Sequence, residues 1–337
     1  MSSSKTTLEE VLSSHQKKQS WVEKYRPKTI NDIQHQQEIV SSIKNFMDRD
    51  NIPHFLFYGP PGTGKTSTIM AIISELKTQH KVDNILELNA SNERGINTVR
   101  TKIKNFAQHS SVAGKIKFIV LDESDTMTND AQTALRRCME LYSKHTRFCL
   151  LCNYVSRIID PIISRCVIYR FKPIPSLHME TQLQLIANSE KIEIKDESIK
   201  QILHFSNGDL RKAINCLEMS SYFRDFSCYQ IPNITIIKIW KMILSGSFIK
   251  LSTSINEILS EGYDYRYLFK DLVDTAVEIG LSDNYLSILI IAVAKAENAL
   301  IRGSNEMIEL TKVIMSLFNM ISREKKKITQ FIDAKSK

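Results

Sequence analysis

The sequence predicts an α/β domain built on a parallel sheet, followed by two helical domains. Three observations lead to this fold class. Between residues 21 and 171, short β-rich runs alternate with segments of helical length, as in βαβ units whose helices cover both faces of a parallel sheet. A glycine-rich loop joins the first run to a segment that favours a helix. After Pro173 and Pro175, apolar residues recur at three- and four-residue spacing, which is the helical period.

The expected elements follow in chain order. Residues 1–20 are polar, which predicts a disordered tail and no signal peptide. The α/β domain covers residues 21–173, with strands at His54–Tyr58, Ile85–Asn89, Lys117–Leu121, Arg147–Cys152 and Val167–Phe171. A helical domain covers residues 174–232, with helices at His178–Ala187, Asp196–Phe205 and Asp209–Tyr222. A last helical domain covers residues 233–337. Its segment Asn284–Ile301 is apolar on nearly all sides, so we expect its burial against other helices or another subunit.

Composition restricts the class of protein. Apolar residues make up 42% of the 337 residues, which is enough for a sizeable core, and the net charge of +8 suits a polyanionic partner such as nucleic acid. Cys149 and Cys152 face opposite sides of a strand, so they cannot hold one metal ion together. The longest apolar run, Ile288–Ala294, is much shorter than the ~20 residues of a membrane span. We therefore expect a soluble intracellular protein with reduced thiols.

The strongest motif is a phosphate-binding loop. Residues 59–66 match GxxxxGK[ST] between the strand His54–Tyr58 and the helical segment Ser67–Leu76. Glycines let backbone N–H groups converge on phosphates, and the following helix contributes its positive N-terminal end. Lys65 can reach the β- and γ-phosphates of a nucleotide, and the Thr66 hydroxyl can bind Mg²⁺. The alternative is a chance glycine-rich loop, and the strand–helix context argues against it.

Paired carboxylates close a second apolar run. Asp122 and Glu123 follow the strand Lys117–Leu121, about 60 residues after the loop. In a fold with a phosphate-binding loop, the first carboxylate holds the Mg²⁺ shell and the second orients or deprotonates the attacking water. The alternative is an ordinary solvated turn.

Three further polar residues are candidates to complete a hydrolytic site. Asn153 stands at the end of the strand Arg147–Cys152, where it can touch a γ-phosphate or a water. Arg165 precedes the last strand, and Arg211 opens a helix after Gly208 and Asp209. On chemistry alone, the asparagine could instead be a turn residue, and each arginine could be a surface charge.

Several segments together resemble the small subunits of replication factor C, a clamp-loader family. The resemblance is dense from Trp21 to Leu217 and looser beyond. The segments that carry it are Trp21-Val-Glu-Lys-Tyr-Arg-Pro27, Leu56–Ser67, Glu87–Gly95, Ala131–Arg137, Ser164-Arg-Cys166 and Gly208-Asp-Leu-Arg211. The resemblance implies an AAA+ P-loop ATPase domain, a helical lid and an all-α C-terminal collar. It also implies ATP and Mg²⁺ as cofactors and a hetero-pentamer with other replication factor C subunits. The implied activity is loading of the PCNA sliding clamp onto primer–template DNA in replication and repair, and the implied location is the nucleus.

The resemblance also implies roles for individual positions. Adenine would lie near Val22, Arg26, Ile33 and Gln34. The phosphates would lie on the loop residues Gly59, Pro60, Pro61, Gly62, Thr63, Gly64, Lys65, Thr66 and Ser67. Asp122 and Glu123 take the positions of the Walker B acids, and Asn153 and Arg211 those of sensor 1 and sensor 2. Arg165 takes the position of an arginine finger, which acts on ATP bound in the neighbouring subunit.

The resemblance also implies DNA contacts at Arg94, Arg100 and Arg157. A clamp loader holds duplex DNA without reading its sequence, so its contacts should go to phosphates. Arg100 and Lys104 lie four residues apart on one helical face, and Arg157 follows the sensor strand. The alternative is that these arginines are ordinary surface charges.

Two departures from the family pattern and two rival functions remain. Ser124 stands where Ala is usual in the acidic box, and Asn92 where Asp is usual; neither removes a catalytic carboxylate.

An independent AAA+ DNA remodeller would call for a winged-helix domain after the lid, which the helical pattern does not suggest. An ATP-inert scaffold subunit would supply only Arg165 to its neighbour, and the complete loop with both acids argues against it.

Overall fold

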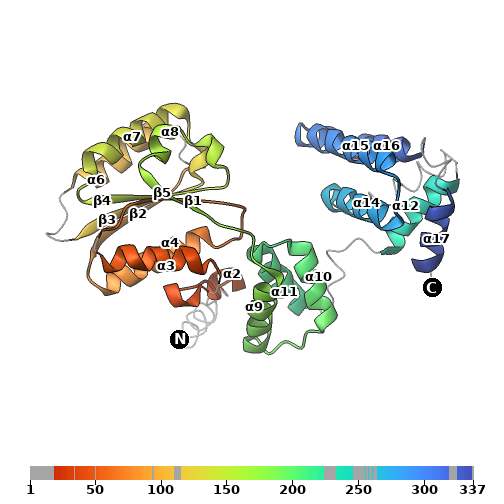
Figure 1. Cartoon of the computed structure of the whole chain (residues 1–337), viewed down its shortest axis with the longest axis horizontal. Helices are drawn as coiled ribbons and strands as arrows, with labels where there is room; N and C mark the ends of the chain where they lie inside the picture. The colour runs from red at the N-terminus through yellow and green to blue at the C-terminus, as the bar shows by residue number, and fades with distance from the viewer. Residues whose placement is uncertain are drawn as a thin grey trace, which may run out of the picture. The chain divides into compact units, whose positions relative to one another are not determined.

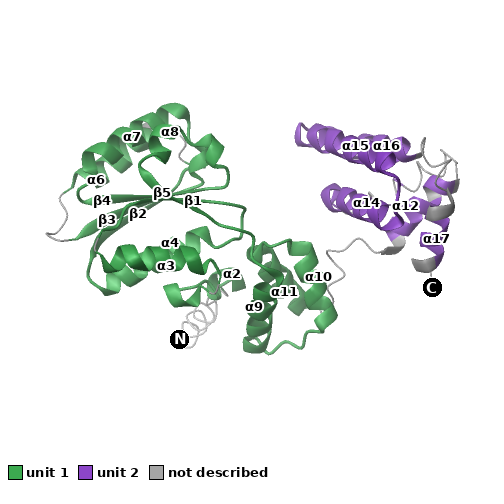
Figure 2. Ribbon diagram, in the orientation of Figure 1, with its two compact units in different colours: residues 1–226 green, residues 227–337 purple. Residues whose placement is uncertain are grey.

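The computed structural model describes residues 19–33, 35–49, 51–92, 95–109, 115–223, 233–245, 264–318 and 325–335, together with 255, 257 and 260. The chain forms two compact units, residues 1–226 and 227–337 (Figures 1 and 2). Of the tail expected over residues 1–20, residues 1–18 lie outside the described part. The domain boundaries at residues 173 and 232 stay predictions.

A five-stranded parallel sheet forms the centre of unit 1, so the predicted fold class is confirmed. The strand order is β2-β3-β4-β1-β5. The strands are β1 (His54–Tyr58), β2 (Val82–Asn89), β3 (Ile116–Asp122), β4 (Thr146–Cys152) and β5 (Cys166–Arg170). Tyr58 of β1 pairs with Cys152 of β4, and Leu121 of β3 pairs with Leu150 of β4. The strands are parallel, so the residues that follow β1, β3 and β4 all lie at one edge of the sheet.

Helices cover both faces of this sheet, as Figure 1 shows. Phe55 and Phe57 of β1 pack in one apolar layer with α3 (Gln37–Asp48) and α4 (Lys65–Thr78). Leu56, between them, packs in the opposite layer with α7 (Asn129–Tyr142). This alternation follows from the two-residue period of a strand, and burial on both faces explains why these strands are apolar throughout. Shorter elements complete the domain: η1 (Ile30–Asp32), α5 (Ile96–Thr98), η2 (Val99–Ile103), α6 (Lys104–Gln108), η3 (Ser124–Thr126), η4 (Val155–Arg157) and α8 (Asp160–Ile163).

Three helices follow the sheet within unit 1 and form the lid. They are α9 (Ser176–Ser189), α10 (Asp196–Ser206) and α11 (Leu210–Phe223). Asn207 and Gly208, with φ of 47° and 85°, make the left-handed turn between α10 and α11. The short N-terminal helix α2 (Trp21–Lys24) packs against α11, although almost 200 residues separate them along the chain.

Unit 2 is helical throughout its described residues. Its helices are α12 (Asn233–Ser245), α14 (Tyr265–Ile279), α15 (Asp283–Ile301), α16 (Glu306–Phe318) and α17 (Lys325–Lys335). Trp240, Phe269 and Ile314 are fully buried in its core.

The apolar helix α15 is buried on one stripe only within this chain. Leu289, Val293, Ala296 and Leu300 are buried, whereas Ile291 keeps 52% of its surface exposed. Burial of its other faces by another subunit therefore stays a prediction. By length and composition, α15 is also the one helix among the described residues that could cross a membrane. Within unit 2 it packs against α14 and α16.

Candidate nucleotide-binding site

The glycine-rich loop lies between β1 and α4, as the motif requires. Gly62 and Gly64 have φ of 70° and 89°, in the left-handed region where other residues are strained. A Cβ atom on Gly62 would lie 1.7 Å from Oδ1 of Asp209, at the start of the lid helix α11. The Leu210 N–H donates to the carbonyl of Gly62 at 3.3 Å. The left-handed backbone therefore favours glycine at both positions, and the close approach of the lid also requires it at Gly62.

Lys65 holds a buried positive charge at this loop. Its Nζ donates to the carbonyl oxygens of Gly59 (2.7 Å) and Pro60 (2.8 Å) and to Oδ1 of Asn153 (3.0 Å). Burial lowers the pKa of Lys65, while the nearby Asp122 carboxylate acts in the opposite direction. The ammonium group thus joins the loop to the end of β4, where Asn153 was expected.

Thr66 and the paired acids form the next part of the site. Thr66 Oγ1 donates to Asp122 Oδ2 at 2.9 Å, and the Glu123 N–H donates to Asp122 Oδ1 at 2.9 Å. Glu123 itself has a left-handed φ of 53°, a conformation that is rare for a residue with a side chain and often marks a functional site. A hydroxyl and a carboxylate oxygen side by side are hard ligands of the kind that Mg²⁺ prefers.

Asp125 positions the backbone of Asn153, and Ser124 links the end of β3 to β4; the sequence did not reveal either contact. Asp125 Oδ2 accepts the N–H groups of Asn153 (3.3 Å) and Tyr154 (3.2 Å). Ser124 Oγ donates to the carbonyl of Leu151 at 2.9 Å, so the departure from Ala adds a link between β3 and β4. The acidic sequence after β3 includes Asp125, but its hydrogen-bond partners Asn153 and Tyr154 follow β4, so the sequence pattern did not reveal them.

These residues surround a cavity of about 220 Å³ with three walls. One wall is the N-terminal segment with Val22, Tyr25 and Arg26, and the second is the loop with Asp122, Glu123 and Asn153. The third is the lid, which contributes Leu210, Arg211 and Ile214. The structure therefore brings together most of the predicted nucleotide ligands: Val22, Arg26, Pro61, Gly62, Thr63, Gly64, Lys65, Thr66, Ser67, Asp122, Glu123, Asn153 and Arg211.

The remaining adenine candidates lie elsewhere. Ile33 is 7% exposed and packs in the same apolar core as α4, and Gln34 lies outside the described residues. His35 lines the cavity instead, with Nε2 3.1 Å from the carbonyl oxygen of Thr63. Burial lowers the pKa of His35, which favours the neutral ring. A lone histidine carries no sequence signal for such a role.

Arg165 does not line the cavity of its own chain. Its guanidinium donates to the carbonyl of Pro161 at 2.6 Å and forms an ion pair with Glu140 of α7. Glu140 also accepts from Arg136 Nε at 3.0 Å, and this bond is the main cause that lowers the pKa of Glu140. About a third of the Arg165 side chain is exposed, so it is accessible to a partner.

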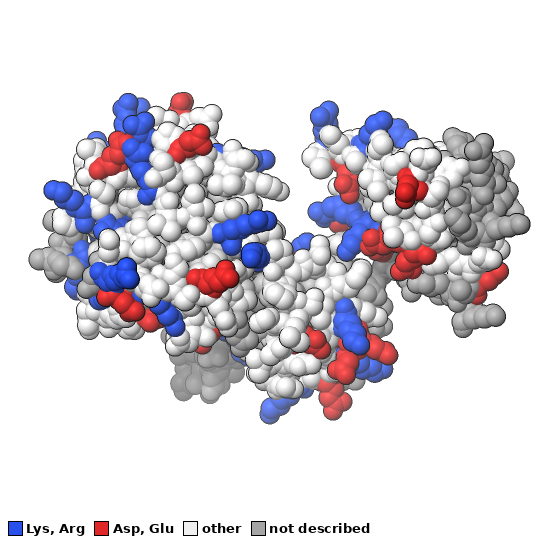
Figure 3. Space-filling model, viewed as in Figure 1, with Lys and Arg blue, Asp and Glu red and all other residues white. Residues whose placement is uncertain are grey.

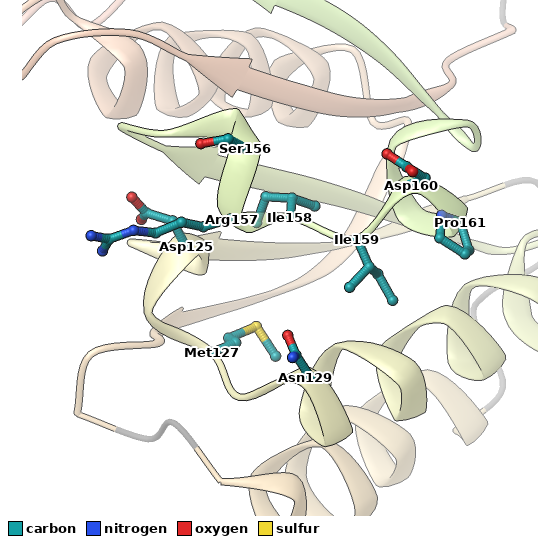
Figure 4. Close-up of a pocket in the computed structure, with 9 residues that line it drawn as sticks. All are labelled: Asp125, Met127, Asn129, Ser156, Arg157, Ile158, Ile159, Asp160 and Pro161. Carbon is teal, nitrogen blue, oxygen red and sulfur yellow. The ribbon is translucent and has the colours of Figure 1, made fainter.

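The arginines expected to contact DNA lie on different elements. Arg100 is exposed in η2, beside the exposed Lys104, while Arg94 lies outside the described residues. The Arg157 guanidinium stacks 5.2 Å from the centre of the Tyr154 ring. It lines a second cavity, of about 660 Å³, together with Asp125 and other residues labelled in Figure 4. On the face drawn in Figure 3, basic side chains are interspersed with acidic ones rather than gathered in one patch.

Three family models match successive parts of the chain. The ATPase family associated with various cellular activities (AAA) matches residues 55–174, the RCF1/5-like AAA+ ATPase lid domain matches 181–221, and the replication factor C C-terminal domain matches 231–316. The last match includes α15, which is therefore part of a known helical domain.

Named relatives are similar over almost the whole chain. Human replication factor C subunit 4 is 42% identical over 323 residues, covering 90% of this chain and 89% of its own. Replication factor C small subunit 1 of Pyrobaculum aerophilum is 38% identical over 324 residues, covering 92% and 97%. The small subunit of Archaeoglobus fulgidus is 38% identical over 313 residues, covering 90% and 98%. The stretch of residues 146–161 also resembles the subunit type numbered 4 in vertebrates and 2 in yeast.

Among solved structures, a RuvB variant from Thermotoga maritima has a similar fold. It aligns with a TM-score of 0.52 at 18% identity, covering 88% of this chain and 91% of its own. At this identity the likeness describes the fold alone.

Proposed function

Because this chain belongs to the replication factor C small-subunit family, with an AAA ATPase domain, a lid and the family's C-terminal domain, we propose that it hydrolyses ATP within a clamp loader. It assembles with other replication factor C subunits into a hetero-pentamer. This ring opens the PCNA sliding clamp and loads it onto primer–template DNA during replication and repair. In this proposal the complex works in the nucleus.

One observation carries the proposal of hydrolysis. Side chains from three strand ends meet at the loop: Lys65 Nζ lies 3.0 Å from Asn153 Oδ1, and Thr66 Oγ1 lies 2.9 Å from Asp122 Oδ2. Such a set places a cation, a hydroxyl, a carboxylate and an amide around the position of a nucleotide's terminal phosphate. A loop that served only to connect a strand to a helix would not require these four groups around it.

Each residue then has a distinct role. The backbone N–H groups of the loop and the N-terminus of α4 bind the phosphates, and Lys65 neutralises their charge. Glu123 orients or deprotonates the attacking water, and Asn153 positions that water against the γ-phosphate. Arg211 approaches the phosphates from the lid, while Val22 and Arg26 form the wall for the base.

Thr66 and Asp122 would hold Mg²⁺, because both present oxygen ligands at a hydrogen-bond distance from each other. When bound, the ion supplies positive charge that stabilises the transferring phosphoryl group. Asp122 also accepts the Glu123 N–H, which fixes the orientation of its carboxylate.

Arg165 acts on ATP bound in the neighbouring subunit. Support for this role comes from its position outside the cavity of its own chain and from the partial exposure of its side chain. A guanidinium supplied in trans stabilises the charge that develops in the transition state. Likewise, Arg100, Arg157 and Arg94 would contact the DNA backbone.

The test is reconstitution of the tagged chain with its co-purified partners. We expect four further replication factor C subunits and ATP-dependent loading of PCNA onto primed DNA. A ring in which Lys65→Ala leaves loading unchanged would favour the ATP-inert scaffold, and a chain that purifies alone and remodels DNA would favour an independent motor.

A further inference from the structure

The N-terminal wall of the nucleotide cavity is hydrogen-bonded to the lid. The Trp21 N–H donates to Glu218 Oε2 of α11 at 3.1 Å. Lys24 Nζ donates to Glu190 Oε1 at 2.5 Å, and the Tyr25 hydroxyl donates to the same oxygen at 2.6 Å. Glu190 is the residue that ends α9. Two lid helices therefore hold a segment that lies about 165 to 197 residues earlier in the chain.

This attachment is specific to the lid. For residues 19–27, every long-range hydrogen bond seen in the described part of the chain goes to α11 or to the end of α9. The helix α2 also packs on α11. The phosphate-binding loop, by contrast, is continuous with β1 and α4 and is held by the sheet. The N-terminal wall and the loop wall of the cavity are thus held by different parts of unit 1.

Glu190 is suited to act as the attachment point. Its side chain is 19% exposed and accepts two donors on one oxygen, one of which is a cation. The hydrogen bond from Lys24 to Glu190 is the main cause that raises the pKa of Lys24, and burial together with Glu190 raises the pKa of Tyr25. Both donors therefore keep their protons near neutral pH, and the bonds are charge-assisted.

We infer that Glu190 and Glu218 are positioning residues of the nucleotide site, which tie the base wall to the lid. Recognition of the base then depends on the position of the lid, whereas binding of the phosphates depends mainly on the loop. The inference rests on the proposed function, because it takes Val22 and Arg26 as the wall for adenine.

The test compares Glu190→Ala with Glu193→Ala, an exposed glutamate three residues later that serves as a matched control. Calorimetric titration of the full-length chain would measure affinity for ATP and for inorganic tripolyphosphate. Removal of one charge-assisted anchor should weaken ATP binding about 10-fold, with tripolyphosphate affinity unchanged. Tyr25→Phe should weaken ATP binding less than Glu190→Ala does. In the Glu190→Ala background, Tyr25→Phe should cause no further loss of ATP affinity, because both changes remove the bond between Tyr25 and Glu190.

A second readout does not depend on nucleotide. The chain has two tryptophans, and Trp240 is fully buried, so acrylamide quenching reports on Trp21. Glu190→Ala and Glu218→Ala should each increase this quenching, and Glu193→Ala should not.

The outcomes separate this inference from the proposed function. Wild-type chain that binds no ATP would overturn both. Wild type that binds ATP, with Glu190→Ala unchanged in ATP affinity and in quenching, would overturn the inference alone. Equal losses of ATP and tripolyphosphate affinity would also overturn it, because the effect would then be a general loss of structure.

Discussion

Asp209 of the lid lies directly against Gly62 of the phosphate-binding loop. The carboxylate oxygen Oδ1 would be 1.7 Å from a Cβ atom on Gly62, and the same oxygen accepts the Lys212 N–H at 3.1 Å, as the cap of α11. The lid helix therefore begins on the loop itself, so a change at the contact between Gly62 and Asp209 affects both the loop and the start of α11.

The first prediction concerns this contact. Gly62→Ala should weaken ATP binding at least tenfold, because the new methyl group displaces the start of α11 and the left-handed backbone adds a strain of about 1–2 kcal/mol. Asp209→Ala in the same chain should restore part of the affinity by removing the clash, although the strain remains. Titration with ATP measures the affinities of the two single variants and of the double variant. If the losses in binding free energy of the single variants simply added in the double variant, the contact would be contradicted.

The second prediction concerns Lys65. Lys65→Ala should abolish ATP binding and leave the fold intact, because the ammonium group is the buried cation of the loop. Binding of a fluorescent ATP analogue and far-ultraviolet circular dichroism measure the two properties. Lys77→Ala, an exposed lysine in the last turn of the same helix, should bind as wild type does. Unchanged affinity for Lys65→Ala would exclude this cavity as the nucleotide site.

The third prediction concerns Arg165. Arg165→Ala should lower the ATPase rate of the assembled complex and barely change nucleotide affinity of the isolated chain. A finger supplied in trans contributes about 10³–10⁵ to the rate at one site, but other sites of the ring continue to turn over. Lys144→Ala, an exposed basic residue near Glu140, is the control. A loss of ATP binding by the isolated Arg165→Ala chain would show instead that this guanidinium serves its own cavity.

The fourth prediction concerns DNA. The triple variant of Arg94, Arg100 and Arg157 to alanine should weaken binding of the assembled loader to primed DNA. If each arginine neutralises one phosphate, the slope of log K against log salt should become shallower by about 0.9 per residue. Sequence preference should not change, because phosphate contacts carry no base information.

Its control replaces the exposed lid residues Lys191, Lys195 and Lys200 with alanine, which removes the same number of charges elsewhere. Equal slopes for the arginine variant and the wild type, with ATPase activity retained, would identify these arginines as ordinary surface charges.

The fifth prediction concerns pH. Burial, with a smaller contribution from Arg147, lowers the pKa of His54 to about 4, and its Nδ1 accepts the Phe148 N–H. An unfolded histidine, with a pKa near 6.5, binds its proton first as the pH falls, so the folded state loses stability between pH 6.5 and 4. Between pH 7.5 and 5 the loss should be about 2 kcal/mol. His54→Asn, which keeps an acceptor but cannot titrate, should remove this part of the pH dependence of thermal unfolding.

Local patterns in the sequence were sufficient for the fold class and for the centre of the site. The alternation of β-rich and helical segments predicted the strands to within three residues, because strand and helix periods are properties of short segments. The spacing of the loop motif fixes Lys65 and Thr66 at the start of α4. Parallel strands bring their carboxyl ends to one edge of a sheet, so Asp122 and Asn153 were expected at the same edge as the loop. The strand order β3-β4-β1 then brings these two strand ends beside it.

Tertiary structure alone decided the contacts between distant segments. No local pattern placed His35 rather than Ile33 at the cavity, paired Arg165 with Glu140, or joined Asp125 to the backbone N–H groups that follow β4. The same is true of Glu190 and Glu218, which meet their partners across more than 160 residues. Side-chain periodicity specifies which face of an element is buried, but the partner of a polar side chain depends on how whole layers pack. For this reason the sequence determined the chemistry of the loop, and the packed structure determined which segments line the cavity and which side chains Arg157 and Arg165 contact.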